Sequence, residues 1–208
     1  MNNPTFTTIG VERLRMNSDG KGITTLVAGY GCPLRCQWCL NPQCFKESTK
    51  TETFTVEQLI EKVSIDHLYF LATEGGITFG GGEPLLYADF IHSFRQKCPE
   101  EWKINLETSL NIESECLLKV LEDIDCFIVD IKDMNPDIYQ RYTGKNNDLV
   151  VKNLSLLPKE KTIVRIPHIP DYNNDSDIQE SLDQIRQIGF EQTNVFPYDK
   201  NRSLRKQK

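Results

Sequence analysis

Two kinds of short apolar segment alternate along this 208-residue chain, and this alternation limits the folds open to it. Segments rich in β-branched and aromatic residues, typical of strands, span residues 23–28, 76–79, 104–108, 126–131, 162–166 and 193–196. Segments with helical spacing lie between or after them, at residues 55–63, 88–97, 113–121, 136–142, 149–157 and 177–188. This order predicts right-handed βαβ units with a parallel sheet. Six units are too few to close an eight-stranded barrel, so we expect an α/β fold, a partial (β/α)6 barrel that stays open.

Two of these helices carry boundary signals in the sequence. Thr55 followed by Gln58 is a capping-box pattern at the start of the first helix. Asp177 is expected to cap the last helix, and Gly189 to end it.

Composition narrows the class of protein. The chain carries a net charge of −6, which argues against a nucleic-acid partner. Neither a signal-peptide pattern nor an apolar run of about 20 residues is present, so we expect no membrane partner and a cytoplasmic location. The length fits a single domain over residues 1–208, with the basic residues at 200–208 forming a flexible tail.

Three cysteines lie close together in the segment that follows the first predicted strand. Cys32, Cys36 and Cys39 have the spacing C-x3-C-x2-C. Three thiolates can hold three irons of a [4Fe–4S] cluster, which leaves the fourth iron open to a small molecule. The alternative is a structural zinc site that adds Cys44. The rest of the chain offers no second cysteine or histidine doublet, so the spacing favours the cluster, with Cys44 as a bystander.

Polar residues gather after the other predicted strands. Gly80-Gly81-Gly82-Glu83 follows the second, where glycines let a ligand approach the backbone and Glu83 can pair with an ammonium group. On its own this segment would read as a tight turn with an exposed glutamate. The ends of the next three strands carry Glu107, Thr108, Asp130, Lys132 and Arg165. Because the carboxyl ends of parallel strands meet at one edge, we expect these side chains to converge with the cysteine loop.

The motifs resemble those of the radical S-adenosylmethionine (SAM) superfamily, and most closely those of the activating enzymes of glycyl radical enzymes. The resemblance rests on Gly31–Pro42 (GCPLRCQWCLNP), on Ile77–Leu86 (ITFGGGEPLL), and on the later segments Asp130-Ile131-Lys132, Tyr142-Thr143-Gly144 and Arg165-Ile166-Pro167. It extends through most of the chain. The cysteine loop is specific to the superfamily, and the later segments indicate the activating enzymes.

The resemblance implies a [4Fe–4S] cluster on Cys32, Cys36 and Cys39, with SAM bound to its open iron. The implied SAM contacts are Trp38 at the adenine, Gly81, Gly82 and Glu83 at the amino group, and Glu107, Asp130, Lys132 and Arg165 at the carboxylate and ribose. Trp38 could equally be a loop aromatic that packs on the core. Glu107, Thr108 and Asp130 are also expected around a monovalent cation.

The same resemblance implies the reaction. One electron from a flavodoxin or ferredoxin-type donor cleaves SAM, and the 5′-deoxyadenosyl radical abstracts a hydrogen atom from a glycine Cα of a partner glycyl radical enzyme. No side chain is required as a general acid or base. Asp19 is a candidate contact for the partner's loop, or else part of a simple Asp-Gly turn.

Several positions depart from the family pattern. Lys21 stands where proline is usual, Gly80 where serine is usual, Glu107 where aspartate is more common, and Asp199 where histidine is usual. These departures keep two other functions open: a small radical SAM enzyme that acts on a peptide or small molecule, and a metal-binding protein without catalysis.

Overall fold

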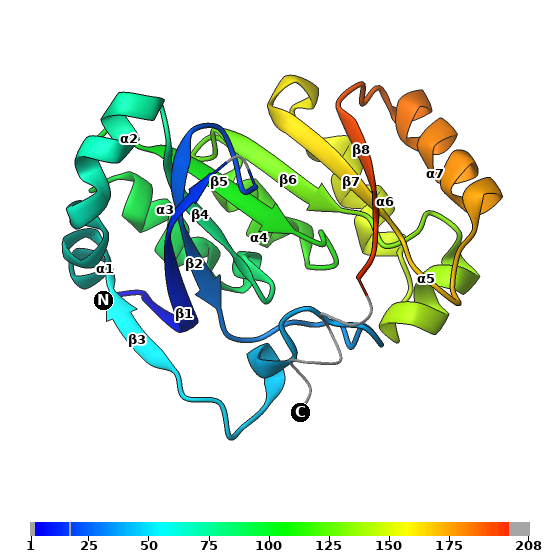
Figure 1. Ribbon diagram of the computed structural model, residues 1–208, viewed down its shortest axis with the longest axis horizontal. Coiled ribbons are helices and arrows are strands. Elements are labelled where there is room, and N and C mark those ends of the chain that lie inside the picture. Colours follow the sequence, from blue (N-terminus) through cyan, green and yellow to red (C-terminus); the bar gives the residue numbers. More distant parts are fainter. Residues whose placement is uncertain (1–2, 17, 200–208) are drawn as a thin grey trace.

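The computed structural model describes residues 3–16 and 18–199, and an eight-stranded sheet in the order β3-β1-β2-β4-β5-β6-β7-β8 forms its centre (Figure 1). The strands predicted from the sequence are present as neighbours in a parallel sheet: β2 (Ile23–Gly29), β4 (Gly76–Gly81), β5 (Lys103–Thr108), β6 (Cys126–Asp130), β7 (Thr162–His168) and β8 (Thr193–Pro197). The strand order begins with β3 and ends with β8, so the sheet is open. The predicted open α/β architecture is confirmed.

Two further strands extend the sheet beyond β2, and the sequence did not reveal them. β1 (Thr5–Met16) pairs antiparallel with β2 and with β3 (Glu52–Thr55). The register of β1 against β2 shifts between Thr8 and Gly10 and again between Glu12 and Arg15. Such bulges break the alternation of apolar and polar residues by which a strand is recognised.

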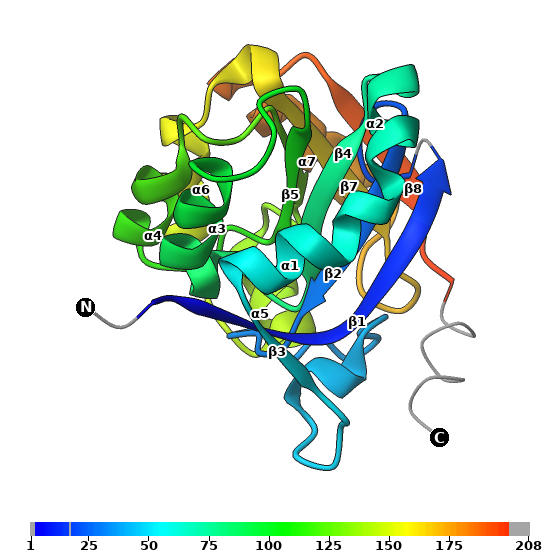
Figure 2. The same cartoon turned by 90° about the vertical axis from the view of Figure 1, so that its left-hand side faces the viewer.

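Helices pack against one face of the curved sheet (Figure 2). The α-helices are α1 (Val56–Val63), α2 (His67–Thr73), α3 (Ala88–Arg95), α4 (Ser114–Val120), α5 (Pro136–Thr143), α6 (Asp148–Leu156) and α7 (Asp175–Ile188). Short 3-10 helices are η1 (Pro42–Phe45), η2 (Ser64–Asp66), η3 (Pro84–Tyr87) and η4 (Lys159–Lys161). The sequence did not predict α2.

The predicted helix boundaries are confirmed with one correction. The capping box of Thr55 and Gln58 begins α1, and Gly189 ends α7 in the left-handed conformation. The N-cap of α7 is Asn174 rather than Asp177, because the Asn174 side chain accepts from the backbone N–H of Asp177 at 3.2 Å. Asp177 occupies the third helical position and its carboxylate returns a bond to the backbone of Asn174 at 2.9 Å. The two residues therefore form a second capping box.

The parallel strands present alternate residues to opposite faces of the sheet. One set is fully buried in the apolar core: Ile104, Leu106, Phe127, Val129, Val164 and Ile166. The intervening residues line cavities on the other face: Asn105, Glu107, Ile128, Asp130, Ile163 and Arg165. The alternation places Glu107, Asp130 and Arg165 on the concave face, whereas Thr108 has the same parity as the buried Ile104 and Leu106.

The segment that carries the cysteines leaves the end of β2 and runs along the lower side of the molecule in Figure 1. Within residues 3–16 and 18–199, no helix is long and apolar enough to cross a membrane. The basic segment 200–208, predicted to be a flexible tail, lies outside the described residues.

Candidate active site

A cavity of about 340 Å³ opens at the carboxyl ends of the parallel strands. It is lined by most of the residues proposed from the sequence: Cys32, Cys36, Cys39, Asp19, Gly81, Gly82, Glu107, Thr108, Asp130, Lys132 and Arg165. Two candidates, Trp38 and Glu83, are not among its lining residues. Of the strand-end side chains predicted to converge with the cysteine loop, all but Glu83 line this cavity.

The cysteine loop is fixed to the C-terminal end of α5 by backbone hydrogen bonds. The N–H of Arg35 donates to the carbonyl of Thr143 at 2.9 Å, and that of Gln37 to the carbonyl of Tyr142 at 3.0 Å. Gly144, with a φ of +77°, ends the helix directly after these carbonyls. The Tyr-Thr-Gly segment therefore ends a helix where the loop needs acceptors.

The three cysteines of the loop are all half-buried. Burial raises the pKa of Cys32 to about 12 and that of Cys36 to about 11. Deprotonation at neutral pH needs a compensating positive charge, which metal binding supplies. Among the described residues, no group of three or more His, Cys, Asp or Glu side chains is placed to hold a single metal ion. That finding concerns one shared ion, whereas a cluster takes one thiolate at each iron.

Cys44 lies in η1, is 1% exposed, and does not line the cavity. A hydrogen bond with Cys39, together with burial, raises the pKa of the Cys44 thiol. Its carbonyl accepts from the N–H of Gly31 at 2.6 Å, which ties η1 to the start of the loop. The prediction that Cys44 is not a ligand remains a prediction.

The end of β4 lies directly against the start of the cysteine loop. A Cβ on Gly82 would stand 2.1 Å from the carbonyl oxygen of Gly31, and Gly81 has a φ of +87°. The N–H of Glu83 donates to the carbonyl of Gly31 at 2.8 Å. The Asn41 side chain donates to the carbonyl of Gly81 at 3.0 Å. Only glycine permits this approach, which joins the two motifs into one wall of the cavity.

Glu83 is 1% exposed and its carboxylate is held by residues at the end of β5. It accepts from the Thr108 hydroxyl at 2.7 Å, and from the N–H and hydroxyl of Ser109 at 3.0 and 2.7 Å. Burial raises the pKa of Glu83 despite these bonds. The structure thus places Glu83 behind the glycine wall, where it fixes the end of β4 to the end of β5.

Four charged side chains form a network on the floor of the cavity. Arg165 reaches Glu107 at 3.1 Å and Asp130 at 2.7 Å, and Lys132 lies 3.3 Å from the other oxygen of Asp130. Burial raises the pKa of Glu107 to about 7 even with Arg165 adjacent. Burial alone would also raise the pKa of Asp130, but the charges of Lys132 and Arg165 outweigh it and hold that pKa below its usual value.

Asp19 is 2% exposed and lines the same cavity. Its carboxylate forms an ion pair with Arg15, whose second nitrogen lies 2.9 Å from the other oxygen. The Thr78 hydroxyl donates to its backbone carbonyl at 2.5 Å. These contacts hold the loop between β1 and β2 against the concave face of the sheet.

The sequence assigned no role in the site to two residues that shape it. Asn41 joins the two motifs, and Tyr142 lines the cavity beside the cysteines. Asn41 and Tyr142 stand inside segments that carry the family resemblance, which was the available signal. Arg15 lies on the bulged strand β1, and nothing local in the sequence predicts its pairing with Asp19.

A family model described as the radical SAM superfamily matches residues 26–185. The chain belongs to the radical SAM superfamily. Curated relatives include the (2S)-3-sulfopropanediol dehydratase activating enzyme of Klebsiella oxytoca, 30% identical over 76% of this chain and 69% of that protein. The pyruvate formate-lyase-activating enzyme of Listeria monocytogenes is 30% identical over 86% of this chain and 77% of that protein.

Solved structures support the fold. SuiB of Streptococcus suis, bound to its precursor peptide SuiA, superposes with a TM-score of 0.65 at 14% identity. The match covers 84% of this chain and 38% of SuiB. At this identity the similarity concerns the fold alone.

The residues present fit the cofactors of this superfamily, a [4Fe–4S] cluster and SAM. Three thiols line one wall, and they are the ligands that such clusters take. The adjacent wall is formed by Gly81 and Gly82, which present bare backbone to the cavity. A Cβ would come within 2.7 Å of a neighbouring atom at Gly81 and within 2.1 Å at Gly82, so neither position has room for a side chain. The floor offers both cationic and anionic groups, which suits the ammonium and carboxylate of an amino acid.

Proposed function

We propose that this protein is an activating enzyme that installs a glycyl radical in a partner enzyme. The observation that carries the proposal is the meeting of the three-thiol loop, the bare glycine wall and the charged floor in one cavity of a radical SAM chain. Two relatives at 30% identity bear the names of activating enzymes, which supports this substrate class over others in the superfamily.

Each part of the cavity receives a role in this proposal. Cys32, Cys36 and Cys39 hold three irons, and the cluster when bound supplies the electron that releases the 5′-deoxyadenosyl radical from SAM. Gly81 and Gly82 border the SAM amino group, with Glu83 behind them. The remaining contacts are Arg165 and Glu107 toward the carboxylate, Asp130 and Lys132 toward the ribose, and Trp38 toward the adenine. The protein positions the reactants and excludes water, and no side chain acts as a general acid or base.

The proposed partner is a glycyl radical enzyme whose glycine loop enters the cavity past Asp19. A flavodoxin or ferredoxin-type protein is the proposed electron donor, and the cytoplasm of an anaerobic cell the proposed setting. We further propose that residues 1–208 form a single radical SAM domain.

Anaerobic assays test the proposal in two stages. Protein reconstituted with iron and sulfide, reduced with dithionite and given SAM, is expected to release 5′-deoxyadenosine and methionine. Adding the partner enzyme is expected to give a glycine-centred doublet in electron paramagnetic resonance, and a partner whose radical glycine is replaced by alanine gives none. A full iron load without 5′-deoxyadenosine contradicts the radical SAM assignment.

A second candidate is a radical SAM enzyme that acts on a peptide or small molecule. The observation that favours it is the pairing of Arg165 with Glu107, a residue that departs from the aspartate of the family pattern given above. SAM cleavage without a glycyl doublet on any glycyl radical enzyme of the host would select this candidate.

A further inference from the structure

The residues expected around a monovalent cation do not surround an open space. Thr108 directs its hydroxyl to Glu83 at 2.7 Å, away from the other two candidates. Glu107 and Asp130 both pair with Arg165, at 3.1 and 2.7 Å. The place between the two carboxylates is therefore taken by a guanidinium, and the three residues do not fit an inorganic cation.

Gly80 is the reason that Glu107 fits at this place. A Cβ on Gly80 would lie 3.0 Å from Oε2 and 3.2 Å from Cβ of Glu107, and 3.2 Å from Cδ1 of Leu26. These distances are tighter than ordinary van der Waals contact. The missing side chain on β4 makes room for the longer carboxylate on β5, so the two departures from the family pattern compensate each other.

When Glu107 is ionised, the charges of the floor are balanced without an added ion. Two carboxylates, Glu107 and Asp130, face two cations, Arg165 and Lys132, and each of these side chains is between 18% and 26% exposed. An inorganic cation placed between the carboxylates would meet the Arg165 guanidinium at close range. Like charges in a mostly buried site repel strongly.

We infer that Arg165 serves as a built-in counter-cation between Glu107 and Asp130, so that this protein binds SAM without a monovalent metal ion. Gly80 acts as a positioning residue, because it lets Glu107 reach Arg165. The inference rests on the proposed function only in naming SAM as the ligand.

The first test needs no SAM. Thermal unfolding is compared for the wild type, Gly80→Ala, Glu107→Asp and the double variant. In the wild-type background the added methyl group pushes Glu107 away from Arg165, so the melting temperature falls. The shorter Asp removes the contact with Oε2 and leaves those with Cβ of residue 107 and with Leu26, so the fall is smaller. Gly10→Ala is the matched control, since a Cβ there meets nothing within 4 Å. Additive effects of the two changes would overturn the positioning role of Gly80.

The second test measures cation dependence on the cluster-loaded protein. Melting temperature and the Kd for SAM are determined at one ionic strength in KCl, NaCl or choline chloride. The wild type is expected to give the same values in all three salts. Arg165→Gln is expected to bind SAM about tenfold more weakly in choline chloride, and to recover part of this loss in KCl or NaCl.

Two results would overturn the inference. One is a saturable rise with K⁺ or Na⁺ in the melting temperature or SAM affinity of the wild type. The other is an Arg165→Gln variant that responds to neither ion. Failure to bind SAM in every salt contradicts the proposed function instead, and the melting temperatures in the three salts still decide the cation question.

Discussion

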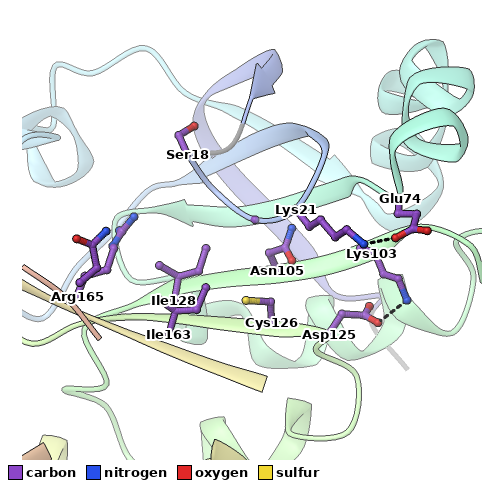
Figure 3. A pocket seen from close by; sticks show the side chains of 12 residues that line it. Ser18, Lys21, Glu74, Lys103, Asn105, Asp125, Cys126, Ile128, Ile163 and Arg165 are labelled. Atoms are coloured by element: carbon purple, nitrogen blue, oxygen red, sulfur yellow. Dashed lines mark hydrogen bonds and ion pairs between the residues drawn. The ribbon is translucent and has the colours of Figure 1, made fainter. Parts of the chain in front are cut away.

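Two cavities share the concave face of the sheet, and only one of them gathers reactive groups. The cavity at the carboxyl ends of the strands measures about 340 Å³, and a second cavity toward their amino ends measures about 420 Å³. Arg165 lines both, and Figure 3 shows it at one end of the second cavity with two ion pairs at the other. The cavity at the carboxyl ends is lined by the three cysteines of the loop, whereas the second cavity has Cys126 among its lining residues.

The two cavities differ in how their charges are held. In the second cavity, Lys21 and Glu74 form an ion pair while 77% and 68% exposed, and the floor between the charged ends includes Ile128 and Ile163 (Figure 3). In the first cavity, Arg165 and Glu107 are each only 20% exposed. Charges shielded from water interact more strongly. The position at the carboxyl ends and the shielded charges together therefore mark the active site.

The largest effect is expected from removing a cluster thiol. Cys36→Ala is predicted to lose the iron–sulfur absorbance and all release of 5′-deoxyadenosine, because a thiolate ligand is lost. Cys126→Ala is the matched control, since Cys126 lines the second cavity. It is expected to keep both iron content and activity. A full cluster in Cys36→Ala would refute the ligand assignment. An iron-free Cys126→Ala would show that a cysteine of the second cavity is also needed for cluster binding.

The next effect is expected at the glycine wall. Gly82→Ala places a methyl group 2.1 Å from a backbone oxygen that cannot move aside as a side chain can. Overpacking of this kind costs about 1–3 kcal/mol, and SAM affinity should fall with the displaced cysteine loop. Urea unfolding and SAM titration measure the two effects, with Gly10→Ala as control. Equal stability of the two variants would show that the loop and the strand end are not tightly joined.

Part of the fold and of the site could be predicted from the sequence, and part could not. The parallel strands and the cysteine and glycine motifs follow from local pattern and spacing, and the carboxyl-end rule placed them together. Strand β1 escaped prediction because its register shifts between Thr8 and Gly10 and again between Glu12 and Arg15, and Leu14, inside the second shift, has a φ of +56°.

Which side chains contact one another within the site could not be predicted, for a different reason. From the sequence, Thr108 could face either Glu83 or the expected monovalent-cation site. Only the fold shows that its hydroxyl donates to Glu83. Likewise, the sequence shows that Gly80 and Glu107 are unusual, but not that one makes room for the other. These pairings join different strands, so their distances depend on the twist and register of the whole sheet.

A smaller effect is expected from the protonation of Glu107. Its pKa is raised from 4.5 to about 7 by burial, so between these values the folded state binds more protons than the unfolded state. Stability therefore falls as pH rises from about 4.5 to about 7, and levels off above. The cost is about 1.4 kcal/mol per pKa unit.

Urea unfolding between pH 5 and pH 8 measures this effect as the difference between the wild type and Glu107→Gln, which lacks the titrating group. The wild type should lose stability relative to the variant with rising pH. A difference that stays constant would mean that Arg165 keeps Glu107 ionised throughout.

The smallest effect is expected at the exposed end of the second cavity. Lys21→Ala removes the ion pair with Glu74, and both side chains are mostly in contact with water. Exposed ion pairs contribute little because water and salt screen them, so the melting temperature and the rate of SAM cleavage should both match the wild type. The measurement is made at low salt, where the pair would be strongest. A clear loss of SAM cleavage in Lys21→Ala would show that the second cavity takes part in the reaction, since this loop leads directly to Asp19, which lines the first.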